Sequence, residues 1–192
     1  PLWREPSWSG RVRPANIFRA TSSPVPTSPP SISRRRHNRS MQIPAKADYA
    51  IRALLSLARS EAPMSATQLA EEQDLPPKFL GAILSDLRRA ELVVSQRGAA
   101  GGFKLARPAD QITLARVLRV MGGPMAGVRG NRPEDLDYAG VAQPLQEVWI
   151  AVRASLRLVL EHVTVADVAQ GALPTAVTQF THDPDAWTTH TP

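Results

Sequence analysis

The side chains whose types and spacing suggest chemistry are basic and polar residues placed beside glycines and at the starts of helical patterns. Arg97 opens the run RGAAGG, in which glycines let the backbone approach another molecule closely. Narrow minor grooves of DNA attract arginine, and phosphates attract lysine, arginine and hydroxyl groups. The candidate DNA contacts are Lys46, Ser65, Thr67, Gln68, Lys78, Phe79, Arg88, Arg89, Arg97 and Gly98.

The same residues also fit a purely structural interpretation. Arg97 could simply hydrate the tip of a turn, and Lys46 and Lys78 could be ordinary surface charges. Helix capping alone would explain Ser65. Both interpretations stay open at this point, and the elements that position these residues decide which is favoured.

The segment that begins at Ser65 predicts two helices joined by a tight turn. Ser65 followed by Gln68 is typical of a capping box, so a helix begins there. Pro76 and Pro77 end that helix and suit the first turn of the next one, Pro77 to Arg89. The apolar residues of the second helix recur on one face: Phe79, Leu80, Ile83, Leu84 and Leu87. This is the pattern of a helix-turn-helix, whose second helix enters the major groove of DNA.

A β-hairpin is predicted directly after these helices. Residues 92–96 and 102–106 are strand-like runs, and the glycine-rich residues 97–101 join them. A helix-turn-helix followed by such a hairpin is more specific than either alone. It predicts a mainly α-helical fold, a winged helix-turn-helix domain over residues 41–108 with a two-stranded wing.

Shorter helical patterns surround this domain. Residues 46–60 carry an apolar stripe, and residues 110–121 form a linker helix for which Thr113 is a plausible N-cap. Residues 164–169 predict one more short helix. Residues 171–192 show no such pattern and are expected to form an irregular tail.

The longest helical pattern runs from Pro144 to His162. Its apolar residues recur at intervals of three or four, as in helices that pack against another helix: Leu145, Val148, Trp149, Val152, Leu156 and Val159. We expect this helix to dimerise with its own copy in a second chain, because symmetric dimers read palindromic DNA. The alternative is that it folds back on its own domain.

A loop of unusual length, residues 122–143, separates the linker helix from the dimerisation helix. Such loops are usually functional or structureless. We expect a pocket for a small-molecule or protein effector, with Arg129, Arg132 and Tyr138 as its candidate residues beside three acids, Glu134, Asp135 and Asp137. The alternative is a loop that only connects helices.

Composition restricts the possible functions. The 192 residues include no cysteine, which excludes disulfides and thiolate-held metals or clusters. The four histidines do not cluster at ligand spacing, so no metal site and no cofactor are expected. No apolar run is long enough to span a membrane, and we expect a cytoplasmic protein without membrane partners. Enzymes are disfavoured, because no phosphate-binding loop, nucleophile elbow or positioned carboxylate pair occurs, and no catalytic residue is assigned.

The positive charge belongs to the first part of the chain. Eight arginines and one acid give residues 1–40 a charge of +7, and since the whole chain carries +6, residues 41–192 carry −1. Residues 1–40 are rich in proline and serine and predict a disordered basic tail. Three interpretations stay open: translation from a mis-called start upstream of Met41, a basic arm that holds phosphate, and a targeting segment.

Residues 41 to about 170 resemble the Rrf2 family of bacterial winged-helix transcriptional regulators, the IscR, NsrR and CymR type. The likeness rests on KADYAIRALLSLA, SATQLAEEQDLPPKFLGAILSDLRRAELV, the wing RGAAGGFKLARP, the linker ITLARVLRVMGGP and the ending VWIAVRASLRLVLEHVTVADVA. It implies a dimeric DNA-binding regulator in which a long helix crosses its partner and Arg97 enters the minor groove. Gly98, Gly101 and Gly102 match the wing glycines.

The sequence departs from this family at two places. Gly81 stands where some members place a base-reading carboxylate, so that readout is lost. Sensing members carry three cysteines in the loop after the linker helix, and this loop has none. A cysteine-ligated iron–sulfur cluster is therefore excluded, because no soft ligand is present to hold the irons.

Together these observations predict a sequence-specific, repressor-type regulator that binds double-stranded DNA as a homodimer without a cysteine-held cluster. The alternative is a winged-helix module that regulates a partner protein without specific DNA binding. The near-neutral charge of residues 41–192 keeps this alternative open.

Overall fold

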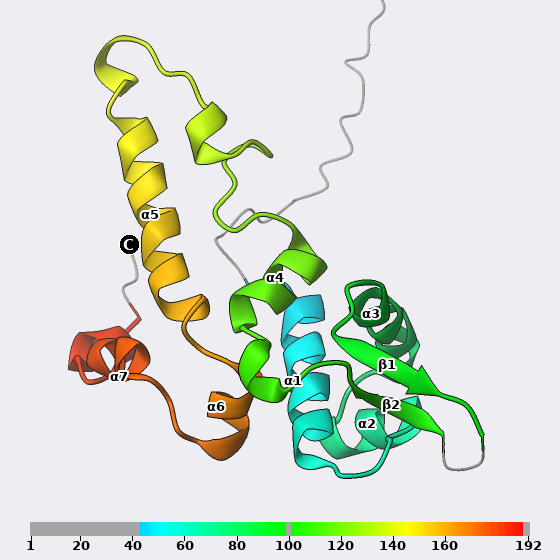
Figure 1. The fold of residues 1–192 in the computed structure, drawn as a ribbon. Helices are drawn as coiled ribbons and strands as arrows, with labels where there is room; N and C mark the ends of the chain where they lie inside the picture. Colours follow the sequence, from blue (N-terminus) through cyan, green and yellow to red (C-terminus); the bar gives the residue numbers. More distant parts are fainter. Residues whose placement is uncertain (1–42, 99–100, 190–192) are drawn as a thin grey trace, which may run out of the picture. The chain divides into compact units, whose positions relative to one another are not determined.

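The computed structural model describes residues 43–98 and 101–189 (Figure 1). The interpretations of residues 1–40 fall outside them. The helices and strands in chain order are α1 (Ala45–Arg59), α2 (Ala66–Gln73), α3 (Pro77–Arg89), β1 (Val93–Gln96), β2 (Gly102–Leu105), α4 (Leu114–Gly122), α5 (Leu145–Leu160), α6 (Val165–Gln170) and α7 (Thr175–Thr181). Short 3-10 turns lie at Ala109–Gln111, Pro133–Asp135, Gly140–Ala142 and Pro184–Trp187.

Helix α1 is the centre of the fold, and α2, α3, α4 and α6 all pack against it (Figure 1). Its buried face carries small residues, with Ala47, Ala50 and Ala53 fully buried beside Leu54. Because these alanines are small and spaced by three, they share one face of the helix and let neighbouring helices approach it closely. The helix expected over residues 46–60 is confirmed.

The helix-turn-helix is confirmed with the predicted caps. The Ser65 hydroxyl accepts a hydrogen bond from the Gln68 amide N–H, and the Gln68 side chain accepts one from the Ser65 N–H. Helix α2 ends at Asp74 in the left-handed conformation, with φ 51°. Pro77 then begins α3, where its missing N–H costs no hydrogen bond.

The wing is a two-stranded antiparallel sheet that is anchored to the segment before α2. Val93 pairs with Leu105 and Gln96 with Gly102. Beyond this pair, Met64 and Phe103 exchange two backbone hydrogen bonds of 3.0 and 2.7 Å. The wing is therefore held on its β2 side, near its turn, by a residue that precedes the helix-turn-helix.

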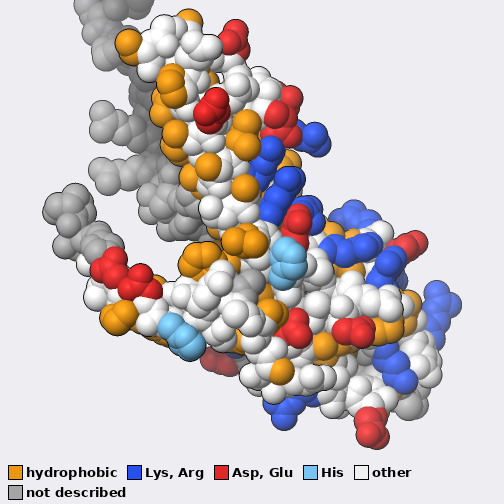
Figure 2. All heavy atoms as spheres, turned by 60° about the vertical axis from the view of Figure 1, so that its left-hand side comes forward, with side chains coloured by type: hydrophobic (Ala, Val, Ile, Leu, Met, Phe, Trp, Pro, Cys, Tyr) orange, Lys and Arg blue, Asp and Glu red, His pale blue; other side chains and the backbone are white. Residues whose placement is uncertain are grey.

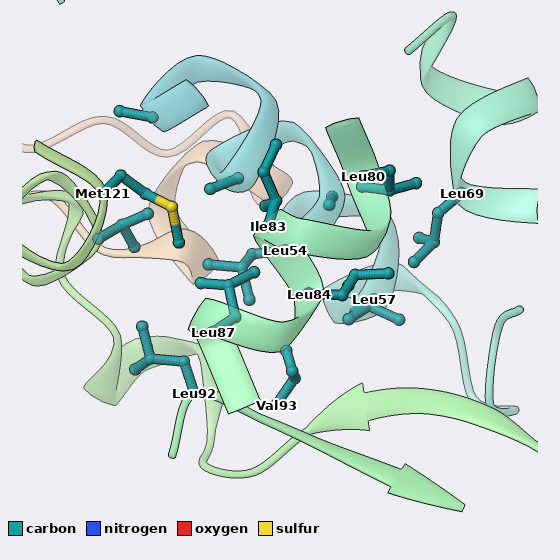
Figure 3. Packing of buried hydrophobic residues seen from close by; sticks show 14 of the residues in the cluster. Leu54, Leu57, Leu69, Leu80, Ile83, Leu84, Leu87, Leu92, Val93 and Met121 are labelled. Carbon is teal, nitrogen blue, oxygen red and sulfur yellow. The ribbon is translucent and has the colours of Figure 1, made fainter. Parts of the chain in front are cut away.

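One hydrophobic core holds the helix-turn-helix and the wing together. Figure 3 shows Leu54 of α1 packed against Ile83 and Leu87 of α3, with Leu92 and Met121 beside them. The core also includes residues from beyond the wing: Ile112, Val117, Leu118, Met121 and Val165. Helices α4 and α6 therefore contribute to the same core as the helix-turn-helix and the wing.

The starts of α4 and α6 are joined to each other. Thr113 caps α4, as predicted, by accepting from the Arg116 N–H, and α4 itself begins at Leu114. Thr113 and Thr164 form an antiparallel bridge, with a 2.9 Å hydrogen bond from the Leu114 N–H to the Val163 carbonyl. The chain between them leaves this junction as α4, the loop and α5, and then returns to it.

The expectation of an irregular tail after Gly171 is wrong. Helix α7 packs against α5, and the following turn is held by a 2.8 Å hydrogen bond from the Trp187 indole to the Thr181 carbonyl. The threonine-rich sequence of α7 has too few apolar residues for a clear period. Tertiary packing supplies the stability that its intrinsic propensity lacks.

Candidate nucleic-acid interface

The outward face of α3 presents the predicted recognition residues. Leu80, Ile83, Leu84 and Leu87 point into the core. Because the helix repeats every 3.6 residues, the residues between them must face outward. Those exposed are Lys78, Phe79, Gly81, Ala82, Ser85, Arg88 and Arg89.

Phe79 gives this face an apolar element. Its side chain is 63% exposed and borders a hollow of about 500 Å³ shared with Tyr49 and Lys46 of α1. An aromatic ring in such a position can contact the methyl group of thymine or a deoxyribose. The interface can therefore combine charge with apolar contact.

A carboxylate stands among these basic residues. Asp86 of α3 forms ion pairs with Lys46 of α1 and with Arg89. The hydrogen bond from Lys46 is the main reason that the pKa of Asp86 lies below its ordinary value. Lys46 and Arg89 are thus partly neutralised within the protein, whereas Lys78, Arg88 and Arg97 have no ion pair among the described residues.

The start of α2 carries exposed hydrogen-bond donors that could bind a phosphate. The hydroxyl of Ser65 and the side-chain oxygen Oε1 of Gln68 are already used as acceptors in the capping box. This leaves the Gln68 amide hydrogens and the exposed Thr67 hydroxyl as donors. Of the three predicted residues here, Ser65 has a structural role, and the other two remain candidate contacts.

Arg97 follows the last residue of β1 and is exposed at the wing turn, beside Gly98 with φ 110°. The glycines have structural roles of their own. A Cβ on Gly101 would lie 2.4 Å from the Gln96 carbonyl oxygen, and one on Gly102 would lie 2.5 Å from that of Met64. These two glycines close the turn and anchor the wing, while Gly98 provides its positive φ.

Lys104 is a basic residue of the wing that the sequence interpretation missed. It is exposed on β2 and pairs across the sheet with Val94, which is 49% exposed. The sequence contained a signal for this residue: alternate residues of a strand share one face, so the strand pattern of residues 102–106 could have placed Lys104 on the exposed face.

Helix α5 carries no fully buried residue. Of its predicted dimerisation residues, Leu145 and Val148 are exposed at 40% and 49%. Val152, Leu156 and Val159 are half-buried and line a hollow with Phe180 of α7. Ile150 and Leu158, which the sequence interpretation did not name, add to the exposed apolar surface, and Figure 2 shows hydrophobic side chains gathered over this part of the molecule.

Trp149 and the candidate effector residues do not form one site. The Trp149 indole donates a 3.1 Å hydrogen bond to the Tyr138 hydroxyl, which ties the loop to α5. Arg129 lies over the Tyr138 ring, 5.7 Å from its centre. Arg132 instead lines a separate hollow with Arg119, Arg153 and Arg157.

The comparisons with known proteins agree with this geometry. The Rrf2 family profile, described as "Iron-dependent Transcriptional regulator", matches residues 43–171. The chain belongs to the Rrf2 family. An HTH-type transcriptional regulator of Mycobacterium tuberculosis is 48% identical over 145 residues, which cover 74% of this chain and 90% of that protein. CymR of Bacillus subtilis is 33% identical over 131 residues, covering 67% and 90%.

Solved structures show the same family. The structure of CymR, the global cysteine regulator of B. subtilis, matches with a TM-score of 0.58 and 32% identity, covering 68% of this chain and 97% of that one. T. potens IscR matches with a TM-score of 0.56 and 28% identity, covering 78% and 93%. This Rrf2 protein is therefore a winged-helix, DNA-binding transcriptional regulator, and the family is not one of enzymes.

The iron in the family's description does not fit the residues of this Rrf2 protein. None of its 192 residues is cysteine. Within residues 43–98 and 101–189, no three side chains from His, Asp and Glu gather as metal ligands would. The donor set for an iron site or a thiolate-held cluster is absent from this part of the chain. In the same residues, no helix has the length and apolar content needed to cross a membrane.

Proposed function

We propose that this Rrf2 protein binds a palindromic operator as a homodimer and represses transcription without a cysteine-ligated cluster. The observation that carries the proposal is a winged DNA-binding domain joined to a long helix, α5, on which Val148, Ile150 and Leu158 stay exposed among the described residues. A second copy of α5 is the natural cover, because a twofold axis pairs identical apolar faces and doubles the DNA contacts.

In the proposed complex, α3 lies in the major groove with Lys78, Phe79 and Arg88 toward the DNA. Arg97 reaches into the adjacent minor groove, and the α2 start at Thr67 and Gln68 contacts a phosphate. The net charge near zero after residue 40 supports a small set of placed contacts over bulk attraction. Repression then follows from occlusion, since a protein seated over a promoter blocks access by polymerase.

The dimer is tested by placing a charge in the proposed interface. Val148→Asp puts a carboxylate on the exposed apolar face of α5, so the variant should sediment as a monomer. Leu173→Asp is the matched control, because Leu173 lies outside α5 and is 44% exposed, close to the 49% of Val148. A Val148→Asp protein that stays dimeric and folded would refute α5 as the interface.

DNA function is tested by footprinting the chromosome with the full chain. The proposal expects discrete protected sites with twofold symmetry near promoters, lost or weakened in Val148→Asp. An absence of discrete sites, with a partner protein retained instead, would favour the alternative of a winged-helix interaction module.

A further inference from the structure

An arginine-lined hollow of about 370 Å³ lies between α4, α5 and the loop that joins them. Its walls carry Arg119 of α4, Arg132 of the loop, and Arg153 and Arg157 of α5. Figure 2 shows basic side chains in a row beside the hydrophobic surface of this region. None of these four arginines is among the proposed DNA contacts.

The charges in this hollow do not balance. Arg153 is paired with Glu134. The pKa of Glu134 lies below its ordinary value, mainly because its carboxylate accepts a backbone hydrogen bond, and also because of the hydrogen bond from Arg153 and the nearby charges of Arg153 and Arg132. Glu161 is shared between Arg119 and Arg157, whose Nε lies 3.7 Å from the carboxylate. Four guanidinium groups thus face two carboxylates among the described residues, which leaves an excess of two positive charges.

We propose that this hollow binds a small, multiply charged oxyanion: a metabolite that carries a phosphate, sulfate or paired carboxylate group. Guanidinium groups match the oxygens of such anions with two parallel hydrogen bonds. The volume falls in the range of small-molecule sites, which begins at roughly 300 Å³. An anion of charge −2 would neutralise the two positive charges that remain after the two glutamates are counted.

The position of the site makes it a candidate for control of DNA binding, and this part rests on the proposed function. Arg119 belongs to α4, which packs against α1 and α3. Arg153 and Arg157 belong to α5, the proposed dimer helix. An anion held between them would link the winged domain to α5.

Binding is tested first without DNA, on the full chain. Isothermal titration with inorganic phosphate, inorganic sulfate and succinate, against chloride at equal ionic strength, should show saturable binding, and the best of the three identifies the anion class. Arg132→Gln and Arg157→Gln should each weaken it about tenfold, as expected for one charge-assisted contact. Glu161→Gln should strengthen it, because it frees two arginines.

The Arg129→Gln variant is the matched control, because Arg129 is an exposed arginine of the same loop outside the hollow. Sulfate and phosphate also stabilise proteins by exclusion from their surfaces, and that effect should be equal in all variants. Equal responses of wild type, Arg132→Gln and Arg157→Gln would overturn the site. Urea midpoints in chloride establish that each variant is folded, and Arg132→Gln, on the loop surface, keeps the test available if Arg157→Gln unfolds.

The regulatory part is tested on the operator found by footprinting. The best-bound anion should change operator affinity by about fivefold or more in wild type and not in Arg132→Gln, a coupling at the low end of the usual range. If the anion binds without changing operator affinity, the regulatory role is refuted, while the anion site itself is confirmed. A lack of operator binding under all conditions would refute the proposed function while the titration still decides the site.

Discussion

The contribution of Arg97 to DNA binding can be worked out from its position. The residue is exposed directly after β1, and it has no ion pair among the described residues. Its guanidinium group is therefore free to bind DNA without first breaking an internal contact. Arg97→Ala should leave the fold intact, because the glycines and the Met64–Phe103 pairing hold the wing in place.

The expected loss is about 1–3 kcal/mol for each wing. A dimer carries two copies of Arg97, so the loss per operator reaches about 2–6 kcal/mol if both wings engage equally. One phosphate contact per wing would also lower the slope of log affinity against log salt by about 0.9, or about 1.8 for the dimer.

Fluorescence anisotropy on an operator duplex between 50 and 200 mM salt measures both quantities. Arg97→Lys separates the two roles, since lysine keeps the charge and loses the planar fork of arginine. Groove insertion predicts a large affinity loss in Arg97→Lys with little change in slope, and simple phosphate contact predicts little loss. Arg129→Ala controls for a generic loss of positive charge. Unchanged affinity and slope in Arg97→Ala would show that the wing does not contact DNA.

Three further predictions concern stability. Gly81→Ala should stabilise the protein by about 0.5–1 kcal/mol in urea denaturation, because its Cβ meets no atom within 4 Å and alanine favours a helix. Gly102→Ala should destabilise it by about 1–3 kcal/mol, because its Cβ would lie 2.5 Å from the Met64 carbonyl oxygen; equal midpoints for the two variants would contradict the packing. The lowered pKa of Asp86 gives stability that is present above its ordinary value of 3.8 and is lost as the pH falls through the folded pKa, so thermal melts of Asp86→Asn should show a weaker dependence on acid than wild type. Parallel acid profiles would refute this role of Asp86.

The elements with local signals were predictable from the sequence. The capping box at Ser65, the cap at Thr113 and the proline start of α3 at Pro77 all depend on residues within one turn of each other. The period of the apolar residues in α1 and α3 likewise identifies the faces that become buried. Such features need no knowledge of the rest of the chain.

Contacts between distant residues had no such signal. Lys46 and Asp86 are forty positions apart, and no pattern in either helix indicates that they meet. The pairing of Met64 with Phe103 is equally hidden, although it explains Gly102. Arg119 and Arg153 look like ordinary helix surface charges until packing brings them together. The sequence therefore indicates which basic residues are candidate DNA contacts. It does not indicate which of them already form ion pairs within the protein.

The bridge between Thr113 and Thr164 has a consequence for how the molecule can be altered. The α5 arm is an insertion with both ends fixed to one point of the body, not an appendage at the end of a chain. A body built this way can accept a different loop and α5, provided that the two threonine ends still meet and α4 keeps its core residues Val117, Leu118 and Met121. Residues 114–163 exchanged as one cassette between relatives should fold when the new α4 fills the same core, whereas a chain truncated within α5 loses Val165 and opens the core that supports the recognition helix.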